Sequence, residues 1–376
     1  MPSKPIKILH VVFSLEPGGM ENGVVNVAKA LRPDDFDIHV CCLNKTGAFA
    51  ERMPDPSKIF ALGRNTGFSL SATLALAKAI IRLKPDVVHS HNLGPLIYSG
   101  LATGLGRLAP LLQGEHSLLT DEECQPRRLK QRRQFYRFCR KVHTVSEGLR
   151  QQLVSLGLPE EKIVTVMNGV DSARFCPGSR QDARRQLGLP ENGLMLGVVG
   201  RFGPFKRHAV LIGALSRLPS EIPDLRLLVV GGGGPEKDRV QALVEASPHA
   251  HRIHLVGFQN NLPPYYRAMD LLVVPSVNEG LSNAVLEAMS CGTPVLANNT
   301  CGNGEVISSG GDGVIAGMEA DAQLVGNLQK VLVEKHKLAT MGEMARKNVM
   351  ARFSLDAMVE NYARLYREVA GRPQTK

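Results

Sequence analysis

Several features that mark particular protein classes are absent from this sequence. Seven cysteines occur in 376 residues, but no two form a Cys-x-x-Cys pair, so neither a disulfide framework nor a zinc site is indicated. The longest apolar-looking passage, residues 93–112, is interrupted by Arg107, glycines and prolines and does not resemble a membrane span. Strand-like residues begin as early as Ile6, which leaves no export signal to predict. These absences favour a reduced, cytoplasmic protein.

The charges that are present are strongly unbalanced. The chain has 45 Lys and Arg against 35 Asp and Glu, a formal net charge of +10 at pH 7. This balance permits anionic partners such as nucleotide diphosphates, lipid phosphates, membrane surfaces or nucleic acid. Nucleic acid is not expected, because no recognised binding module occurs and the cations are concentrated in one segment.

That basic segment, residues 125–141, holds eight cations and no acid, interspersed with aromatic residues. We expect residues 127–141 either to contact an anionic membrane surface or to form a solvated helix face that packs its aromatics inward. The first alternative implies a peripheral location on the inner face of a membrane.

Short runs rich in Val, Ile and Leu alternate with helix-like stretches along the chain. Strand-like examples are residues 6–13, 86–90, 195–200, 225–230 and 271–275. Strands that are apolar on both faces and separated by helices predict an α/β fold with parallel sheets. The turn-rich residues 168–179 interrupt this pattern. We therefore expect one Rossmann-like domain over residues 1–180, a second over 181–353, an amphipathic helix over 354–372, and a ligand in the cleft between the domains.

Two glutamates near residue 280 are candidate ligand-binding residues. A predicted strand ends at Pro275 and a predicted helix begins near Ser282, so Glu279 falls in the loop and Glu287 about one turn into the helix. An ionised carboxylate accepts hydrogen bonds from both hydroxyls of a vicinal diol, such as that of a ribose or a hexose. Alternatively, both glutamates are solvated surface acids.

The helix start supplies a second kind of group. Unsatisfied backbone N–H groups at a helix N-terminus attract phosphate or sugar oxygens. The residues at this position are Gly280, Leu281, Ser282 and Asn283.

Two further loops follow predicted strands. In the first, Arg201 and Lys206 can neutralise a diphosphate, although a solvated basic loop is the alternative and the spacing does not fit a Walker loop. In the second, Gly18 and Gly19 precede a helix predicted from residue 22 and would allow close approach of a ligand, although a simple tight turn is the alternative.

Residues 266–270, 279–287 and 292–295 closely resemble the donor-site signature of the family-four retaining glycosyltransferases. The resemblance covers nearly the whole chain, and residues 18–26 and 113–117 look most like sugar transferases associated with exosortase and exopolysaccharide systems. It implies a GT-B fold whose last helix crosses back to the first domain. It also implies a nucleotide-sugar donor held mainly by the second domain and a glycan or lipid-linked acceptor held mainly by the first.

The resemblance also implies roles for individual residues. Glu287 would bind the ribose diol, Glu279 would contact the transferred sugar, and Arg201 and Lys206 would stabilise the diphosphate leaving group. One departure is Arg207, which stands where the family usually has glycine. No metal or other cofactor is implied.

The remaining residues implied by the resemblance surround the donor. His116 would contact the transferred sugar, Gly18 and Gly19 would face the donor phosphate and the acceptor, and Val256 and Gly257 would lie on the nucleobase side. A buried structural histidine is the alternative for His116.

Other functions stay open at this point. A nucleotide-sugar epimerase or hydrolase, or a non-catalytic protein that binds anionic ligands, would show some of the same features. His89 and His91 could pair on a metal, but no carboxylate nearby in the sequence completes a ligand set, and we do not predict one.

Overall fold

The structure, a computed structural model, describes residues 4–218, 224–309 and 311–373, without the side chain of Cys301. It divides into two compact units, each described here by itself. Unit 1 comprises residues 1–168 and 356–376, and unit 2 comprises residues 169–355.

The division falls after Asn168, whereas the sequence analysis set it at residue 180. The intervening turn-rich residues pack onto unit 2, where Ser290 Oγ donates to Phe175 O at 2.6 Å and Arg267 Nε donates to Cys176 O at 2.7 Å. The tail helix is part of unit 1, because Tyr366 Oη lies 3.0 Å from His89 Nδ1.

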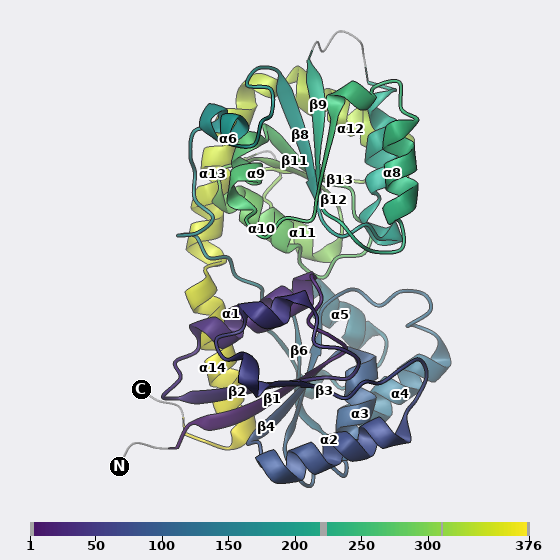
Figure 1. Ribbon diagram of the computed structural model, residues 1–376, viewed down its shortest axis with the longest axis vertical. Helices are drawn as coiled ribbons and strands as arrows, with labels where there is room; N and C mark the ends of the chain where they lie inside the picture. The colour runs from purple at the N-terminus through teal and green to yellow at the C-terminus, as the bar shows by residue number, and fades with distance from the viewer. Residues whose placement is uncertain (1–3, 219–223, 310, 374–376) are drawn as a thin grey trace. The chain divides into compact units, whose positions relative to one another are not determined.

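Unit 1 is built on a parallel sheet of seven strands in the order β3-β2-β1-β4-β5-β6-β7. The strands are β1 (Ile6–Val12), β2 (Phe36–Cys42), β3 (Ile59–Ala61), β4 (Val87–His91), β5 (Leu111–Glu115), β6 (Cys139–Thr144) and β7 (Ile163–Thr165). The helices are α1 (Gly19–Ala30), α2 (Leu70–Leu83), α3 (Leu93–Ala102), α4 (Pro126–Tyr136), α5 (Glu147–Ser155) and α14 (Leu355–Ala370). Figure 1 shows α14, the last helix of the chain, running beside the strands of this unit.

Unit 2 is built on a parallel sheet of six strands in the order β10-β9-β8-β11-β12-β13. The strands are β8 (Leu194–Val199), β9 (Leu225–Val230), β10 (Ile253–Gly257), β11 (Leu271–Val274), β12 (Val295–Asn298) and β13 (Val314–Ala316). The helices are α6 (Arg180–Gln186), α7 (His208–Leu215), α8 (Lys237–Glu245), α9 (Pro263–Ala268), α10 (Asn283–Ser290), α11 (Cys301–Val306), α12 (Asp321–Val333) and α13 (Leu338–Arg352).

The central strands are apolar because helices cover both sheet faces. Residues that alternate along a strand, such as Leu227 and Leu228, are both fully buried, as are Leu271 and Leu272. Each such side chain contributes about 1.5–3 kcal/mol on burial. The α/β class predicted from these continuous apolar runs is confirmed.

Strand order reverses once in each sheet, between β1 and β4 in unit 1 and between β8 and β11 in unit 2. At such a reversal, the loops that leave the carboxyl ends of the two neighbouring strands go to opposite sides of the sheet and leave room for a ligand. The predicted donor-binding residues are therefore expected at the reversal in unit 2, in the loops that follow β8 and β11.

The basic segment is only partly a surface. On α4, Leu129, Arg132 and Tyr136 are buried. The fully buried Arg132 guanidinium donates from Nε to Glu115 Oε1 at 3.3 Å and from Nη2 to Glu123 Oε1 at 3.1 Å. Tyr136 Oη also donates to Glu115 Oε1, at 2.7 Å, and burial beside this carboxylate raises the pKa of Tyr136. Arg132 is therefore a core residue and does not contribute to a basic surface.

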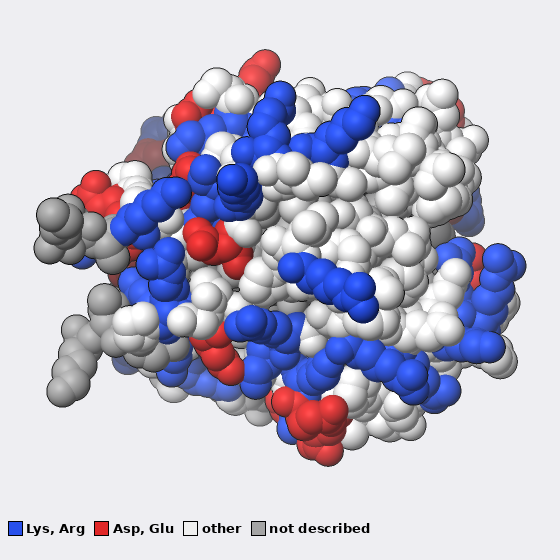
Figure 2. Space-filling model, turned by 90° about the horizontal axis from the view of Figure 1, so that it is seen from below, with Lys and Arg blue, Asp and Glu red and all other residues white. Residues whose placement is uncertain are grey.

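The exposed cations of the segment lie on the opposite side of α4 and just beyond it: Arg127, Arg128, Lys130, Arg133, Arg137 and Arg140. Figure 2 shows one face of the molecule, on which Lys and Arg side chains are interspersed with acidic side chains and broad uncharged areas. No helix within the described ranges is long and apolar enough to cross a membrane.

The Arg132 network generates a stability prediction. Arg132→Met should lower the stability of unit 1 by about 3–5 kcal/mol, because it leaves the Glu115 carboxylate buried without its cation. Arg128→Met, at a half-exposed position on the same helix, should change stability by less than about 0.5 kcal/mol. Urea unfolding followed by circular dichroism measures both, and equal midpoints for the two variants would contradict the assignment.

Candidate functional site

Two loops of unit 2 meet where the strand order reverses. Strand β11 pairs with β8 in parallel, so the loops that follow them leave the same edge of the sheet. There, Val277 N donates to Phe205 O at 3.0 Å, and the Lys206 ammonium forms an ion pair with the Glu279 carboxylate. The structure thus brings together two of the predicted site residues, one from each loop.

The remaining residues of the second loop lead directly into α10. Gly280, Leu281 and Ser282 are buried, and Asn283 is the first residue of the helix, as the sequence predicted to within one residue. Helix α11 packs closely on this turn, because a Cβ built on Gly302 would lie only 1.7 Å from Gly280 O. The start of α10 is therefore fixed by backbone packing as well as by its own hydrogen bonds.

Glu287 lies in a different environment from Glu279. It is buried on α10 with 9% of its surface exposed, and its Oε2 accepts a hydrogen bond from Tyr266 Oη at 2.7 Å. Burial, followed by the nearby Glu287 carboxylate, raises the pKa of Tyr266, so this phenol stays a hydrogen-bond donor at neutral pH. The sequence analysis assigned no role to Tyr266. The signal that could have suggested one is its place in residues 266–270, which resemble part of the donor-site signature.

Glycines at the ends of β8, β9 and β10 bring three backbone segments together. Gly200 N donates to Val230 O at 3.0 Å, and Gly231 N donates to Gly257 O at 2.9 Å. A Cβ on Gly231 would lie 1.9 Å from Gly200 O, so a side chain at this position would push the two loops apart.

The predicted residues of this rim are partly accessible. Arg201 is exposed, and its backbone O accepts from Gly203 N at 2.9 Å, whereas its guanidinium makes no hydrogen bond or ion pair with any residue that the structure describes. Val256 and Gly257 are half-buried at the end of β10, and Val256 O accepts from Gln259 Nε2 at 2.8 Å. Arg201 therefore presents its guanidinium to solvent. It lies in the loop that follows β8, the same loop that contains Lys206.

Arg207 keeps the backbone conformation for which glycine is best suited. Its φ of 55° and ψ of 35° place it in the left-handed region. The side chain compensates by binding the start of α12 and the segment before it: it donates to Met318 O, to Glu319 O at 3.0 Å and to Asp321 Oδ1 at 3.2 Å. The departure from the family pattern thus leaves the loop in a glycine-like conformation and positions Lys206 immediately before it.

Gly18 and Gly19 lie at the reversal point of unit 1, where the chain passes from β1 into α1, and Gly19 is the first residue of that helix. Gly18 is the N-cap of α1, and a Cβ there would lie 2.2 Å from Glu21 Oε2. The glycine therefore makes room for the chain's own Glu21 carboxylate at the helix start. The roles of Gly18 and Gly19 toward a donor phosphate stay predictions.

His116 directly follows β5 in unit 1 and belongs to a cluster of five histidines. Four are buried in the sheet, namely His10 on β1, His89 and His91 on β4, and His143 on β6, whereas His116 is half-buried. The sequence analysis considered only His89 and His91 as a pair. The fold adds the rings of His10, His116 and His143 to that pair, because residues in register on neighbouring parallel strands lie on one face of the sheet. His10 lies opposite His89, and His91 and His143 lie on either side of Gly114.

Hydrogen bonds join these rings into a chain that also includes Tyr366 of α14. The N···N distances are 2.9 Å for His116–His91, His91–His10 and His89–His143, and Tyr366 Oη lies 3.3 Å from His10 Nε2 and 3.0 Å from His89 Nδ1. Burial is the main cause that lowers the pKa of every ring, to about 3 for His10, to about 4 for His116 and well below the usual range for the others. All five rings are therefore neutral at pH 7.

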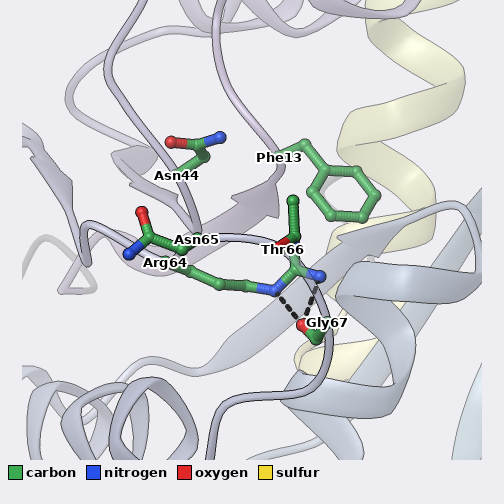
Figure 3. Close-up of a pocket in the computed structure, with 6 residues that line it drawn as sticks. All are labelled: Phe13, Asn44, Arg64, Asn65, Thr66 and Gly67. Atoms are coloured by element: carbon green, nitrogen blue, oxygen red, sulfur yellow. Dashed lines mark hydrogen bonds between the residues drawn. The ribbon is translucent and has the colours of Figure 1, made fainter.

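Unit 1 also contains an open pocket of about 510 Å³ that the sequence analysis did not find. Figure 3 shows its lining residues, which follow the carboxyl ends of β1, β2 and β3: Phe13, Asn44, Arg64, Asn65, Thr66 and Gly67. Arg64 donates from Nε and Nη2 to Gly67 O at 3.0 and 2.6 Å, which closes the loop on itself. The lining combines one aromatic ring with amides, a hydroxyl and a guanidinium.

Comparisons with known proteins agree with this arrangement. Residues 17–174 match the family described as Glycosyltransferase Family 4, and residues 179–348 match the family described as Glycosyl transferases group 1. D-inositol 3-phosphate glycosyltransferase 2 of Catenulispora acidiphila is 30% identical over 397 residues, which cover 95% of this chain and 92% of that protein. The chain therefore belongs to the group 1, family-four glycosyltransferases.

Two further similarities extend over the chain. UDP-Gal:alpha-D-GlcNAc-diphosphoundecaprenol alpha-1,3-galactosyltransferase of Escherichia coli is 25% identical over 96% of both chains. The crystal structure of Anabaena Alr3699/HepE in complex with UDP-glucose matches with a TM-score of 0.84 and 22% identity, covering 96% of this chain and 99% of that one. The expected GT-B fold of two Rossmann-like units is thereby confirmed.

Other relatives match over a shorter length. Several further D-inositol 3-phosphate glycosyltransferases are 32–34% identical, and the chain spans about half their length, 52–56%.

Two variants of Arg207 can separate the effect of its left-handed backbone conformation on stability from the effect of its side-chain hydrogen bonds. Arg207→Gly and Arg207→Ala both remove the bonds to the segment before α12, but only alanine retains the left-handed strain. The glycine variant should therefore be more stable than the alanine variant by about 1 kcal/mol. Chemical unfolding of the two variants side by side tests this, and an alanine variant as stable as the glycine variant would show that the loop does not hold this conformation.

Proposed function

We propose that this chain is a retaining glycosyltransferase that moves a sugar from a nucleotide-diphosphate-sugar to a glycan or lipid-linked acceptor, with no metal in the transfer step. The observation that carries the proposal is the Lys206–Glu279 ion pair at the β8/β11 reversal of unit 2, next to the start of α10. A cation, a carboxylate and the N-terminus of a helix in one place suit a ligand that combines phosphate with hydroxyl groups.

Different residues of unit 2 would bind different parts of the donor. Arg201 and Lys206 would bind the diphosphate and stabilise its charge as it leaves, together with N–H groups at the start of α10. Lys206 has three N–H donors, so it can hold Glu279 with one and still offer two to phosphate oxygens. Acceptor attack on the face from which the diphosphate leaves would retain the anomeric configuration.

The two glutamates would take different parts of the donor. Glu287, held by Tyr266, would accept hydrogen bonds from the ribose diol. Glu279, which is bound to Lys206 and only 12% exposed at its side chain, would position the transferred sugar and stabilise positive charge at the reacting carbon. Val256 and Gly257 would lie on the nucleobase side.

The acceptor would bind to unit 1. The pocket beside Phe13 presents an aromatic face with Asn44, Asn65 and Thr66, which is the combination of stacking and hydrogen bonding that a sugar needs. His116 would reach a sugar hydroxyl through Nδ1, because its Nε2 bonds to His91. The similarity to the E. coli galactosyltransferase, whose name specifies a diphosphoundecaprenol-linked substrate, supports a lipid-linked acceptor.

A lipid-linked acceptor would require contact with a membrane surface. The exposed cations of residues 127–141 would supply it, each adding about 1 kcal/mol near an anionic surface. The protein would then work as a peripheral protein on the inner, cytoplasmic face.

Steady-state kinetics test the division between the glutamates. Glu287→Ala should raise the donor KM by about 10- to 100-fold with a smaller effect on kcat, because it removes hydrogen bonds made to the bound donor. Glu279→Ala should lower kcat by about 100-fold or more, because its charge acts at the reacting carbon.

Glu245→Ala, at an exposed position on α8, is the matched control and should leave both constants unchanged. Near-wild-type kinetics for both site variants would contradict the proposal. Product formed from the donor without any acceptor would instead identify a hydrolase or an epimerase.

Sedimentation with anionic vesicles tests the membrane contact. The combined variant Arg127→Glu, Arg128→Glu and Lys130→Glu should lose most of its binding to vesicles that contain phosphatidylglycerol, because three attractive charges become repulsive. Lys330→Glu, Lys335→Glu and Lys347→Glu change the net charge equally at exposed positions of unit 2 and should retain binding. Equal binding by both triple variants, or none by the wild type, would exclude this surface.

A further inference from the structure

The imidazoles of the histidine cluster of unit 1 converge above a residue that has no side chain. Gly114 on β5 lies between His91 of β4 and His143 of β6 in the parallel register, so the three positions share one face of the sheet. His116 follows two residues after Gly114 and returns to the same face. A Cβ on Gly114 would lie 2.5 Å from His143 Nε2 and 2.9 Å from His116 Nε2. The absence of a side chain at residue 114 is thus what allows these imidazole nitrogens to converge.

The converging nitrogens have the spacing of metal ligands. One ring nitrogen from each of His91, His116 and His143 lies within 4.8 Å of the other two. Three imidazoles that share a zinc ion at bonds of about 2.0–2.1 Å need nitrogens somewhat closer than this, which small ring rotations can provide. A second group, His10, His89 and His91, meets the same limit but is fully buried.

The hydrogen-bond chain leaves one buried atom unsatisfied. Five neutral imidazoles and Tyr366 carry six hydrogens for five links, so one N–H must remain at an end of the chain. His143 Nδ1 is buried, and no residue within the described ranges lies in hydrogen-bonding geometry with it. The hydrogen bonds among the described residues therefore do not satisfy every nitrogen of the cluster.

We propose that His91, His116 and His143 form a site for a borderline divalent transition metal, of which zinc is the representative, seated above Gly114. Imidazole nitrogen is a preferred ligand of this class of metals, and three histidines with one open position are an established zinc arrangement. His116, the half-buried member, gives the ion its route of entry. The site links β4, β5 and β6. The metal would bind His116 through Nε2, so Nδ1, the nitrogen proposed to reach a sugar hydroxyl, would not be a ligand.

The surrounding groups support ligation without loss of a proton. The rings are already neutral, so each offers a lone pair without first releasing a proton to the solvent. When His91 binds metal through Nδ1, its Nε2–H donates to His10 Nδ1, and His10 Nε2–H donates in turn to Tyr366 Oη. Such second contacts orient a ligating histidine and fix its tautomer. Glu115 faces the other side of the sheet toward Arg132, so a water or an anion from solvent would occupy the open position.

Isothermal titration calorimetry of the intact chain with Zn²⁺, after removal of metal by a chelator and dialysis, tests the proposal. The wild type should bind one equivalent with a saturable isotherm, and elemental analysis after desalting should confirm one zinc per chain. Gly114→Ala keeps every histidine but places a methyl group against His143 Nε2 and His116 Nε2, so it should weaken zinc binding by at least about tenfold, as should His116→Asn, which removes one ligand.

Two controls separate metal binding from folding and from other histidines. His251→Asn, at an exposed position in unit 2, should bind zinc as the wild type does. Urea midpoints measured without metal show whether each variant is folded, and if Gly114→Ala is not, His116→Asn at the half-buried edge decides the question. No saturable binding by the wild type would overturn the proposal. So would wild-type affinity in the folded site variants, or loss of binding in His251→Asn.

Discussion

The ion pair between Lys206 and Glu279 is the interaction on which the rest of the candidate site depends. It joins the loops that follow β8 and β11, the two strands of unit 2 between which the strand order reverses. Because both strands are parallel and adjacent, their carboxyl ends must lie side by side, and residues 73 positions apart in sequence become neighbours. The glycines at the ends of β8, β9 and β10 extend this edge, since any side chain at Gly231 would separate the loops.

Glu279 and Glu287 have identical side chains, but their different surroundings suit them to different roles. Glu279 faces a lysine in a loop, whereas Glu287 is buried on a helix and receives a hydrogen bond from a tyrosine. A carboxylate beside an ammonium in a loop can respond to charge that develops on a substrate. A carboxylate fixed by a buried phenol is better suited to hold one part of the substrate in place.

Local sequence patterns predicted the elements of the fold but not the contacts between distant residues. The apolar runs at residues 225–230 and 271–275 predicted β9 and β11, because strands buried on both faces have few polar positions. Strand β11 is one residue shorter than its run. Glu279 and Glu287 fall in the loop and the helix where turn and helix signals placed them. Their partners could not be predicted, since Lys206 and Tyr266 reach them only through the tertiary fold.

The same limit explains what was missed in unit 1. Arg132 looked like one cation among eight, yet it is buried because Glu115 and Glu123 from another part of the chain surround its guanidinium. Five histidines from four separate sequence segments meet only because β1, β4, β5 and β6 lie next to one another in the sheet. The pocket beside Phe13 is likewise made of loop residues whose proximity no periodicity encodes.

The central claim is that the β8/β11 edge of unit 2 binds the diphosphate of a nucleotide sugar. Calorimetric titration of the intact chain with a panel of uridine, guanosine and adenosine diphosphate sugars, on wild type and on Arg201→Ala, tests it most directly. The account predicts saturable binding of at least one member of the panel and a loss of at least about tenfold in affinity for the variant, because a charge-assisted hydrogen bond to phosphate is removed. No binding to the wild type, or equal affinity in the two proteins, would contradict it.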